Sequence, residues 1–389
     1  MATLKLEGVT KTFGKKTAVS NLGLEIGDNE FFVMLGPSGA GKTTTLKSVA
    51  GLVELDAGQV TIGGRSMDGV EPYQRNVAMA FESYALYPQK TVFENLASPL
   101  RSGRTGKYSK ADQEKRVEMV TTTLGINQFL DQFPRELSNG QRQRVALGRV
   151  LVRPADLYLL DEPLSHLDAK LRAAMRVELK QLGEMSKTTT FYVTHDYQEA
   201  LALGDRIAVL RAGELVQVGT PRQLWREPVD TFVAKTLGQP EINLLDAEIS
   251  DGRIRAAGGA IDMVAPRHLT LPSNGKVRLG IRPRDLEVAR QGRGGDGWLK
   301  MSGQIILSER LGRQVELGVQ VGNTTLIVLG STHFSESEGD AIEVQVLHGN
   351  VLVFEAGAED EDTRLIGAYT DDVPSMATGT EHDPIRSVR

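Results

Sequence analysis

The pattern Gly-x-x-x-x-Gly-Lys-Thr begins at Gly36 and ends with Lys42 and Thr43. Gly36, Gly39 and Gly41 permit unusual backbone angles and leave the backbone amides open to an anion. In this spacing the lysine reaches the β- and γ-phosphates of a nucleotide, and the threonine hydroxyl binds the Mg²⁺ that bridges them. A chance glycine-rich turn is the alternative. Because an apolar run precedes the pattern and a helix start follows it, we predict a nucleotide site.

Two adjacent carboxylates, Asp161 and Glu162, lie at the end of a second apolar run, and His195 lies at the end of a third. Downstream of a phosphate-binding loop, one carboxylate can hold the Mg²⁺ shell while the other accepts a proton from the attacking water. Taken alone, the acidic pair would be a capping turn before Pro163, and the histidine would be a surface residue at a strand end. The three side chains are therefore candidates for catalysis only in combination with the phosphate-binding loop.

Short apolar runs that alternate with helical patterns surround these candidates. Runs of this length are too short for helices and predict strands that are buried on both faces of a parallel sheet. In such a sheet, catalytic groups collect at the carboxyl ends of the strands. The expected strands are 31–35, 156–163 and 190–195, and the expected helices are 43–50 and a segment whose apolar face is Leu171, Met175, Leu179 and Leu182.

The region from residue 84 to about residue 153 carries helical signals. Ser109 and Asp112 have the spacing of a capping box, which predicts a helix start. The apolar face of that helix consists of Val117, Val120 and Leu124. We expect this region to be a helical subdomain.

The sequence pattern changes after residue 238. Strand-like segments are separated there by Gly, Asp and Asn, which predicts an all-β domain of the small-barrel kind. The acidic run 359–362 and the polar residues that follow predict a disordered tail. The expected strands are 244–249, 277–281, 304–307, 315–319, 325–329, 342–346 and 351–354.

Length and composition bound the class of protein. With 389 residues the chain is long enough for two or three domains, and 40% hydrophobic residues allow a sizeable core. The net charge of −5 gives no electrostatic footprint for nucleic acid. The sequence has no cysteine, which excludes disulfides and thiolate metal sites. No segment approaches the roughly 18 apolar residues of a spanning helix, so we expect a soluble, cytoplasmic chain that reaches a membrane only through partners.

A family resemblance rests on several motifs that occur in one order. Residues 137–144, Leu-Ser-Asn-Gly-Gln-Arg-Gln-Arg, resemble the signature motif of ATP-binding cassette (ABC) proteins. With the phosphate-binding loop, the Asp161-Glu162 pair and the segments 165–168 and 194–196, they resemble the whole ABC ATPase series over roughly residues 3–235. The resemblance implies an α/β P-loop ATPase with ATP and Mg²⁺ as cofactors.

Further segments resemble the ATPase subunits of bacterial carbohydrate importers of the maltose and glycerol-3-phosphate type. These segments are 83–88, 219–221, 232–234, 240–243 and 280–283. Such subunits carry an OB-like regulatory domain after the ATPase domain. The implied domains are 1–237 for nucleotide binding, with a helical subdomain at about 84–153, then 238–356 for the OB-like domain and 357–389 for the tail.

The resemblance also implies roles for single residues. Glu162 would be the catalytic base, His195 would contact the γ-phosphate, and Phe13 would stack on adenine. The phosphates and Mg²⁺ would be held by Gly36, Ser38, Gly39, Ala40, Gly41, Lys42, Thr43 and Thr44, with Asp161 in the metal shell. The nucleotide of an opposing subunit would meet Ser138, Gly140, Gln141 and Asp168. The implied partners are a second ATPase chain, identical or paralogous, two transmembrane permease subunits at the cytoplasmic face of the cell membrane and, indirectly, a solute-binding protein.

Two residues depart from the family pattern. Glu82 stands where the family has glutamine, so that a carboxylate faces the metal and the attacking water as a further candidate ligand and catalytic group. Asn139 replaces a glycine of the signature and adds a side chain where the partner's phosphate approaches. Neutral drift is one interpretation, and a heterodimer with a non-identical ATPase chain is the other. The rival functions are a soluble, non-transport ABC ATPase and a regulatory, non-hydrolysing cassette.

Overall fold

The computed structural model describes residues 2–81, 84–101, 108–165, 167–266, 268–289, 297–312, 314–331, 334, 336–358 and 360–369, with the backbone alone at 182 and 184–186. The chain divides into two compact units, Met1–Pro221 (unit 1) and Arg222–Arg389 (unit 2). This division lies ahead of the predicted domain boundary at residue 237. The helix α8 (Thr231–Thr236) belongs with the strands that follow it, because its Ala234 packs with Phe354 in one apolar cluster.

Unit 1 is built on a six-stranded sheet of the order β10-β9-β3-β8-β7-β6. Its strands are β3 (Phe31–Leu35), β6 (Val77–Ala80), β7 (Leu157–Asp161), β8 (Thr189–Thr194), β9 (Arg206–Arg211) and β10 (Glu214–Gly219). All neighbours run parallel except β10, which is antiparallel to β9. Every residue of β3, β7 and β8 is buried, as predicted for central strands.

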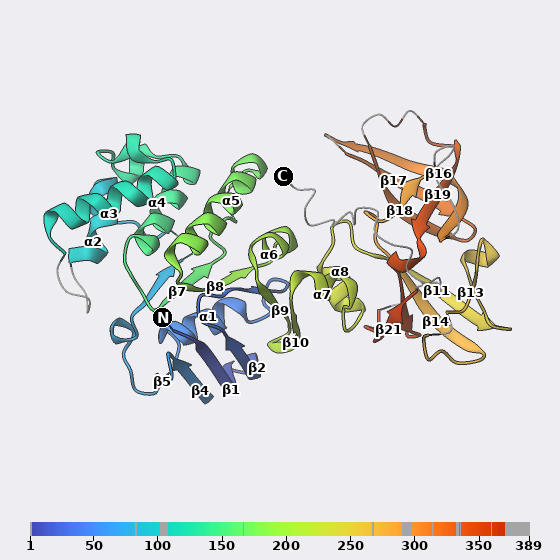
Figure 1. Ribbon diagram of the computed structural model, residues 1–389, viewed down its shortest axis with the longest axis horizontal. Helices are drawn as coiled ribbons and strands as arrows, with labels where there is room; N and C mark the ends of the chain where they lie inside the picture. Colours follow the sequence, from blue (N-terminus) through green and yellow to red (C-terminus); the bar gives the residue numbers. More distant parts are fainter. Residues whose placement is uncertain are drawn as a thin grey trace. The chain divides into compact units, whose positions relative to one another are not determined.

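A second, antiparallel sheet lies beside the first in unit 1. It has the order β2-β1-β4-β5, with β1 (Leu4–Phe13), β2 (Lys16–Ile26), β4 (Ala57–Ile62) and β5 (Arg65–Ser66). Leu4, Leu6 and Val60 from this sheet share one core with Phe32 of β3 and Leu46 of the helix α1 (Lys42–Ala50). In this core α1 packs against β7 and β8 of the parallel sheet and against β2 of the antiparallel sheet (Figure 1).

The remaining helices of unit 1 follow the predicted pattern. They are α2 (Val92–Arg101), α3 (Lys110–Thr123), α4 (Asn139–Leu151), α5 (Ala169–Ser186) and α6 (Tyr197–Leu203). Figure 1 shows α2, α3 and α4 packed together. Ser109 caps α3 and accepts a hydrogen bond from the amide of Asp112, and the predicted apolar face of this helix is buried. In the part of the chain that the structure describes, no helix is long and apolar enough to cross a membrane.

The division between the units falls at the start of the short helix α7 (Pro221–Arg226). Unit 2 continues with α8 and then as an all-β structure, which confirms the predicted class. One sheet has the order β13-β12-β11-β14-β20-β21 and the other β15-β19-β16-β17-β18. The strands are β11 (Asn243–Ser250), β12 (Arg253–Ala256), β13 (Ile261–Val264), β14 (Gly275–Ile281), β15 (Glu287–Val288), β16 (Trp298–Leu311), β17 (Gln314–Val321), β18 (Thr324–Ser331), β19 (Ala341–Leu347), β20 (Val351–Glu355) and β21 (Leu365–Ala368).

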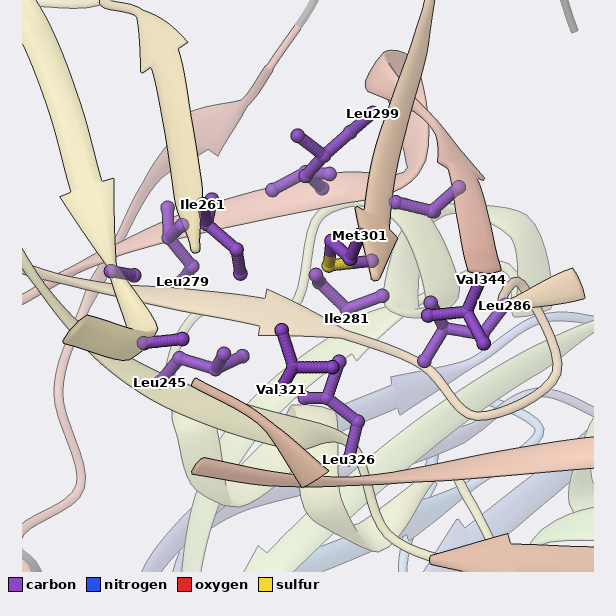
Figure 2. Packing of buried hydrophobic residues seen from close by; sticks show 14 of the residues in the cluster. Leu245, Ile261, Leu279, Ile281, Leu286, Leu299, Met301, Val321, Leu326 and Val344 are labelled. Carbon is purple, nitrogen blue, oxygen red and sulfur yellow. The ribbon is translucent and has the colours of Figure 1, made fainter. Parts of the chain in front are cut away.

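Both sheets of unit 2 are antiparallel and contribute to one core. Figure 2 shows Leu245 and Ile281 of the first sheet with Val321 and Val344 of the second in the same apolar cluster. Strand β21 corrects the predicted tail, because Val353 pairs with Gly367 inside the segment expected to be disordered. Glu359 and residues 370–389 lie outside the described residues.

Candidate active site

The phosphate-binding loop connects β3 to α1 at the carboxyl edge of the parallel sheet. Gly41 is the N-cap of α1 with a φ of 101°, and an added Cβ would lie 2.2 Å from the carbonyl oxygen of Ala18. A side chain is therefore excluded at this position. No side chain caps α1, and the amides of a first helical turn have no partner within the helix. Together with the helix dipole, they form a site for an anion.

Lys42 is held inside this loop with only 4% of its surface exposed. Its Nζ atom donates to the carbonyl oxygens of Gly36, at 2.9 Å, and Pro37, at 3.0 Å. The same atom lies 3.6 Å from Oε1 of Glu162. Burial lowers the pKa of the Lys42 amine, and the carboxylates of Glu162 and Asp161 oppose that shift. The amine thus lies in a dry environment, where its attraction to a phosphate is stronger than in water.

Thr43 and Asp161 meet across the sheet edge although 118 positions separate them in the chain. The Thr43 hydroxyl donates to Oδ1 of Asp161 at 2.8 Å, and Asp161 is buried. Hydroxyl and carboxylate oxygens are ligands that Mg²⁺ prefers, and Mg²⁺ sites in phosphate-binding proteins use one or two carboxylates with the substrate phosphates. The donor set at this position fits Mg²⁺.

Glu162 adopts a left-handed backbone conformation with a φ of 45°. For a residue other than glycine, this conformation costs about 1–3 kcal/mol and needs support from its surroundings. The Glu162 amide donates to the carbonyl of Val193 at 3.0 Å, and its own carbonyl accepts from the amide and the hydroxyl of Ser165. Its Oε2 atom lies 2.8 Å from Nδ1 of His195. The carboxylate is therefore placed between the Lys42 amine and the His195 ring.

The signature residues form a second group at the start of α4. Ser138 and Gln141 cap this helix reciprocally, since each side chain accepts from the other's backbone amide. Asn139 accepts a hydrogen bond from Arg142. A Cβ on Gly140 would lie 2.8 Å from a methyl group of Leu171 on α5, so glycine permits close packing here. Among the described residues, the hydrogen bonds of Ser138 and Gln141 thus join them to each other and not to Lys42 or Glu162.

The other predicted residues lie at the rim of the loop or outside the description. Phe13 ends β1, is 52% exposed and has the Lys11 amine 5.5 Å from its ring centroid. Ser38 is exposed, Ala40 is buried and Thr44 is half-buried. Asp168 caps α5 by accepting from the amide of Leu171 at 2.9 Å. Glu82 lies outside the described residues, as do Ser83, His166 and residues 102–107.

Two residues beside the site were not singled out by the sequence analysis. Arg172 lies on α5 and donates to Asp196, which follows His195. Glu199 lies on α6, is 2% exposed and accepts from the hydroxyls of Tyr192 and Thr194. Both belong to helical segments whose charged residues resemble a solvated face in the sequence. The position of Glu199 three residues after the helix-capping Asp196 is the only local signal for either residue.

A parallel sheet with these residues at its carboxyl edge, together with a signature group on a separate helix, defines an ATP-binding cassette. A family model described as ABC transporter matches residues 19–165. The trehalose/maltose import ATP-binding protein MalK of Thermococcus litoralis is 42% identical over 361 residues, which cover 89% of this chain and 95% of that protein. The sn-glycerol-3-phosphate import ATP-binding protein UgpC of Cereibacter sphaeroides is 46% identical over 290 residues, which cover 74% of this chain and 80% of that protein.

A solved structure agrees with these relatives. The dimeric structure of MJ0796, a bacterial ABC transporter cassette, is similar to this chain with a TM-score of 0.52 and 32% identity. The similarity covers 56% of this chain and 99% of the cassette. The chain therefore belongs to the family of import ATP-binding proteins of ABC transporters, and it is an ATPase. This confirms the family resemblance and the fold class predicted from the sequence.

Proposed function

We propose that this chain is the ATP-hydrolysing subunit of an importer for a sugar, a polyol or a related solute. The observation that carries the proposal is the position of the Glu162 carboxylate, 3.6 Å from the Lys42 amine and 2.8 Å from the His195 ring. Relatives named for trehalose/maltose and sn-glycerol-3-phosphate import support the solute class.

In the proposed reaction, Glu162 accepts the proton of the water that attacks the γ-phosphate in line, while the bond to the β-phosphate oxygen breaks and ADP leaves. Lys42 and the first turn of α1 bind the phosphates, and Thr43 and Asp161 hold Mg²⁺. Mg²⁺ held there would neutralise charge that develops on the phosphate oxygens. His195 orients the Glu162 carboxylate and contacts the γ-phosphate, and Phe13 offers its exposed ring to adenine.

The proposed assembly contains a second ATPase chain. Within one chain, the hydrogen bonds of Lys42 and those of Ser138 go to different partners. An ATP bound between two chains would contact the phosphate-binding loop of one chain. On the other chain it would contact the signature residues Ser138, Gly140 and Gln141, together with Asp168. The dimeric state of the related cassette MJ0796 supports this arrangement. We further propose that two permease subunits hold the dimer at the cytoplasmic face of the membrane and that a solute-binding protein delivers the solute to them.

The test is the variant Glu162→Gln in the complex that co-purifies with this chain. We expect ATP binding to persist while turnover falls by about 10²–10⁴-fold, the usual effect of losing a general base. Glu118→Gln, an exposed change on α3 with the same loss of charge, is the control and leaves turnover unchanged. Near-normal hydrolysis by Glu162→Gln would contradict the assignment of the base. A complex without membrane subunits would contradict the importer.

A further inference from the structure

Contacts on the protein side of the active site join Glu162 to His195 by a second route. The first route is direct, through the 2.8 Å contact between their side chains. In the second, the Glu162 carbonyl accepts from the Ser165 hydroxyl at 3.0 Å, and the Ser165 carbonyl accepts from Arg172 at 3.4 Å. Arg172 also donates to Oδ2 of Asp196 at 3.3 Å, and Asp196 directly follows His195. These contacts close a ring that passes through the guanidinium of Arg172.

The guanidinium of Arg172 uses different nitrogen atoms for the two sides of this ring. One terminal nitrogen donates to the carbonyls of Leu167, at 3.0 Å, and Ser165. The other donates to Asp196. A planar guanidinium presents its donors in a fixed fork, so it sets the separation of the groups that it bridges. The loop after Glu162 and the turn after His195 are thus held at one distance.

The two carboxylates that lie beside Arg172 at the start of α6 are themselves fixed. The other carboxylate oxygen of Asp196 accepts from the amides of Gln198, at 2.8 Å, and Glu199, at 3.4 Å, and so caps α6. Oε1 of Glu199 lies 4.0 Å from Nε of Arg172. Glu199 is anchored by the hydroxyls of Tyr192 and Thr194, at 2.7 and 2.8 Å. Arg172 therefore contacts carboxylates that are held by hydrogen bonds from α6 and β8 and not by the loop that follows Glu162.

Neither Glu162 nor His195 is held by packing alone. Glu162 has a strained backbone with a φ of 45°, and the His195 side chain is 53% exposed. We propose that Arg172 is a positioning residue for hydrolysis, which keeps the Glu162 carboxylate and the His195 ring in register by bridging the Ser165 and Leu167 carbonyls to Asp196. The inference rests on the proposed catalytic roles of Glu162 and His195.

The test compares Arg172→Ala with Arg176→Ala in the intact complex. Arg176 lies one turn further along α5 and donates to the side chain of Gln198 at 3.3 Å, without a contact to Asp196 or to the Ser165 carbonyl. Misplacing a catalytic group by about 1 Å costs up to about 10²-fold in rate. We expect Arg172→Ala to lower kcat by about 10- to 100-fold with KM and the Kd for ATP unchanged. Arg176→Ala is expected to leave kcat, KM and the Kd within about twofold of the unsubstituted protein.

Two further variants make the result decisive. Arg172→Lys keeps the charge and the stem but cannot bridge three acceptors as the fork does, so it is expected to fold normally and to lose part of kcat. In the Glu162→Gln background, Arg172→Ala is expected to cause a much smaller loss, because the carboxylate that must be kept in register with the His195 ring is gone. Full activity of Arg172→Lys, an equal loss of kcat in both backgrounds, or a loss confined to ATP affinity would overturn the proposal. Failure of the base assignment is recognised separately, by near-normal turnover of Glu162→Gln alone.

Discussion

The substitution Tyr192→Phe tests the buried polar network beneath His195. Tyr192 is fully buried and donates to Oε2 of Glu199 at 2.7 Å. Burial raises the pKa of Glu199 above its usual range, while hydrogen bonds from Tyr192 and Thr194 oppose that shift. Removing the hydroxyl creates no large cavity but withdraws a hydrogen bond to a buried carboxylate. Such a bond contributes about 1.5–3 kcal/mol, so we expect the free energy of unfolding of unit 1 to fall by that amount.

The effect of this substitution depends on pH in a defined direction. The pKa of Glu199 is higher in the folded state than in the unfolded chain. Above the folded pKa, the buried carboxylate is charged and lowers the free energy of unfolding. Below the pKa of the unfolded chain, Glu199 is protonated in both states and this cost disappears. Tyr192→Phe raises the folded pKa further, since it removes a donor to the charged form. The loss of stability is therefore largest above the folded pKa of Glu199 and shrinks as the pH falls through that pKa towards the unfolded value.

Calorimetry with and without ATP measures the change, because ATP shifts the unfolding transition of the unit that binds it. For a unit of this size, about 1.5–3 kcal/mol corresponds to a fall in Tm of about 3–12 °C. Tyr158→Phe on the neighbouring strand is the matched control, since that hydroxyl donates to the uncharged carbonyl of Arg153 at 3.3 Å. It is expected to cost about 0.5–1.5 kcal/mol at every pH. Equal shifts for the two variants, or a Tyr192→Phe shift independent of pH, would refute the reasoning.

Two other predictions concern the assembly and the second unit. If Asn139 belongs to a heterodimer of two different ATPase chains, native mass spectrometry of the transporter will show one copy of this chain with a non-identical ATPase subunit. Two copies of this chain with normal ATPase activity would show that the substitution of Asn139 for glycine is neutral drift. In unit 2, Leu279 is fully buried in the core shared by both sheets. Leu279→Ala should destabilise this unit by about 2–5 kcal/mol and leave the Kd for ATP unchanged, measured by calorimetry and nucleotide titration. A matching loss of ATP affinity would contradict the independence of the two units.

The chemistry of the site was predictable because its motifs are local. The phosphate-binding loop at Gly41 can be predicted from neighbouring residues alone. Both of its features, a glycine turn and the start of a helix, are short-range. The same holds for the buried strands β3, β7 and β8, whose apolar runs are consecutive in the chain. Seven strands of unit 2 also lie within or around the predicted segments, because each is bounded by turn residues.

What only the tertiary structure decided depends on pairing between distant segments. The contact of Thr43 with Asp161 follows from the parallel order of β3, β8 and β7, which brings strand ends together that the sequence keeps far apart. The left-handed backbone of Glu162 is sustained by Val193 and Ser165, and no local propensity predicts it for a glutamate. Strand β21 is a short apolar run, Leu365–Ala368, inside the segment expected to be disordered, and it forms where β20 offers it an edge. In the sequence, Arg172 resembles a solvated residue. Folding brings the carbonyls of Ser165 and Leu167 and the carboxylate of Asp196 around it. A charged side chain acquires a structural role only from the acceptors that surround it, and these come from separate segments of the chain.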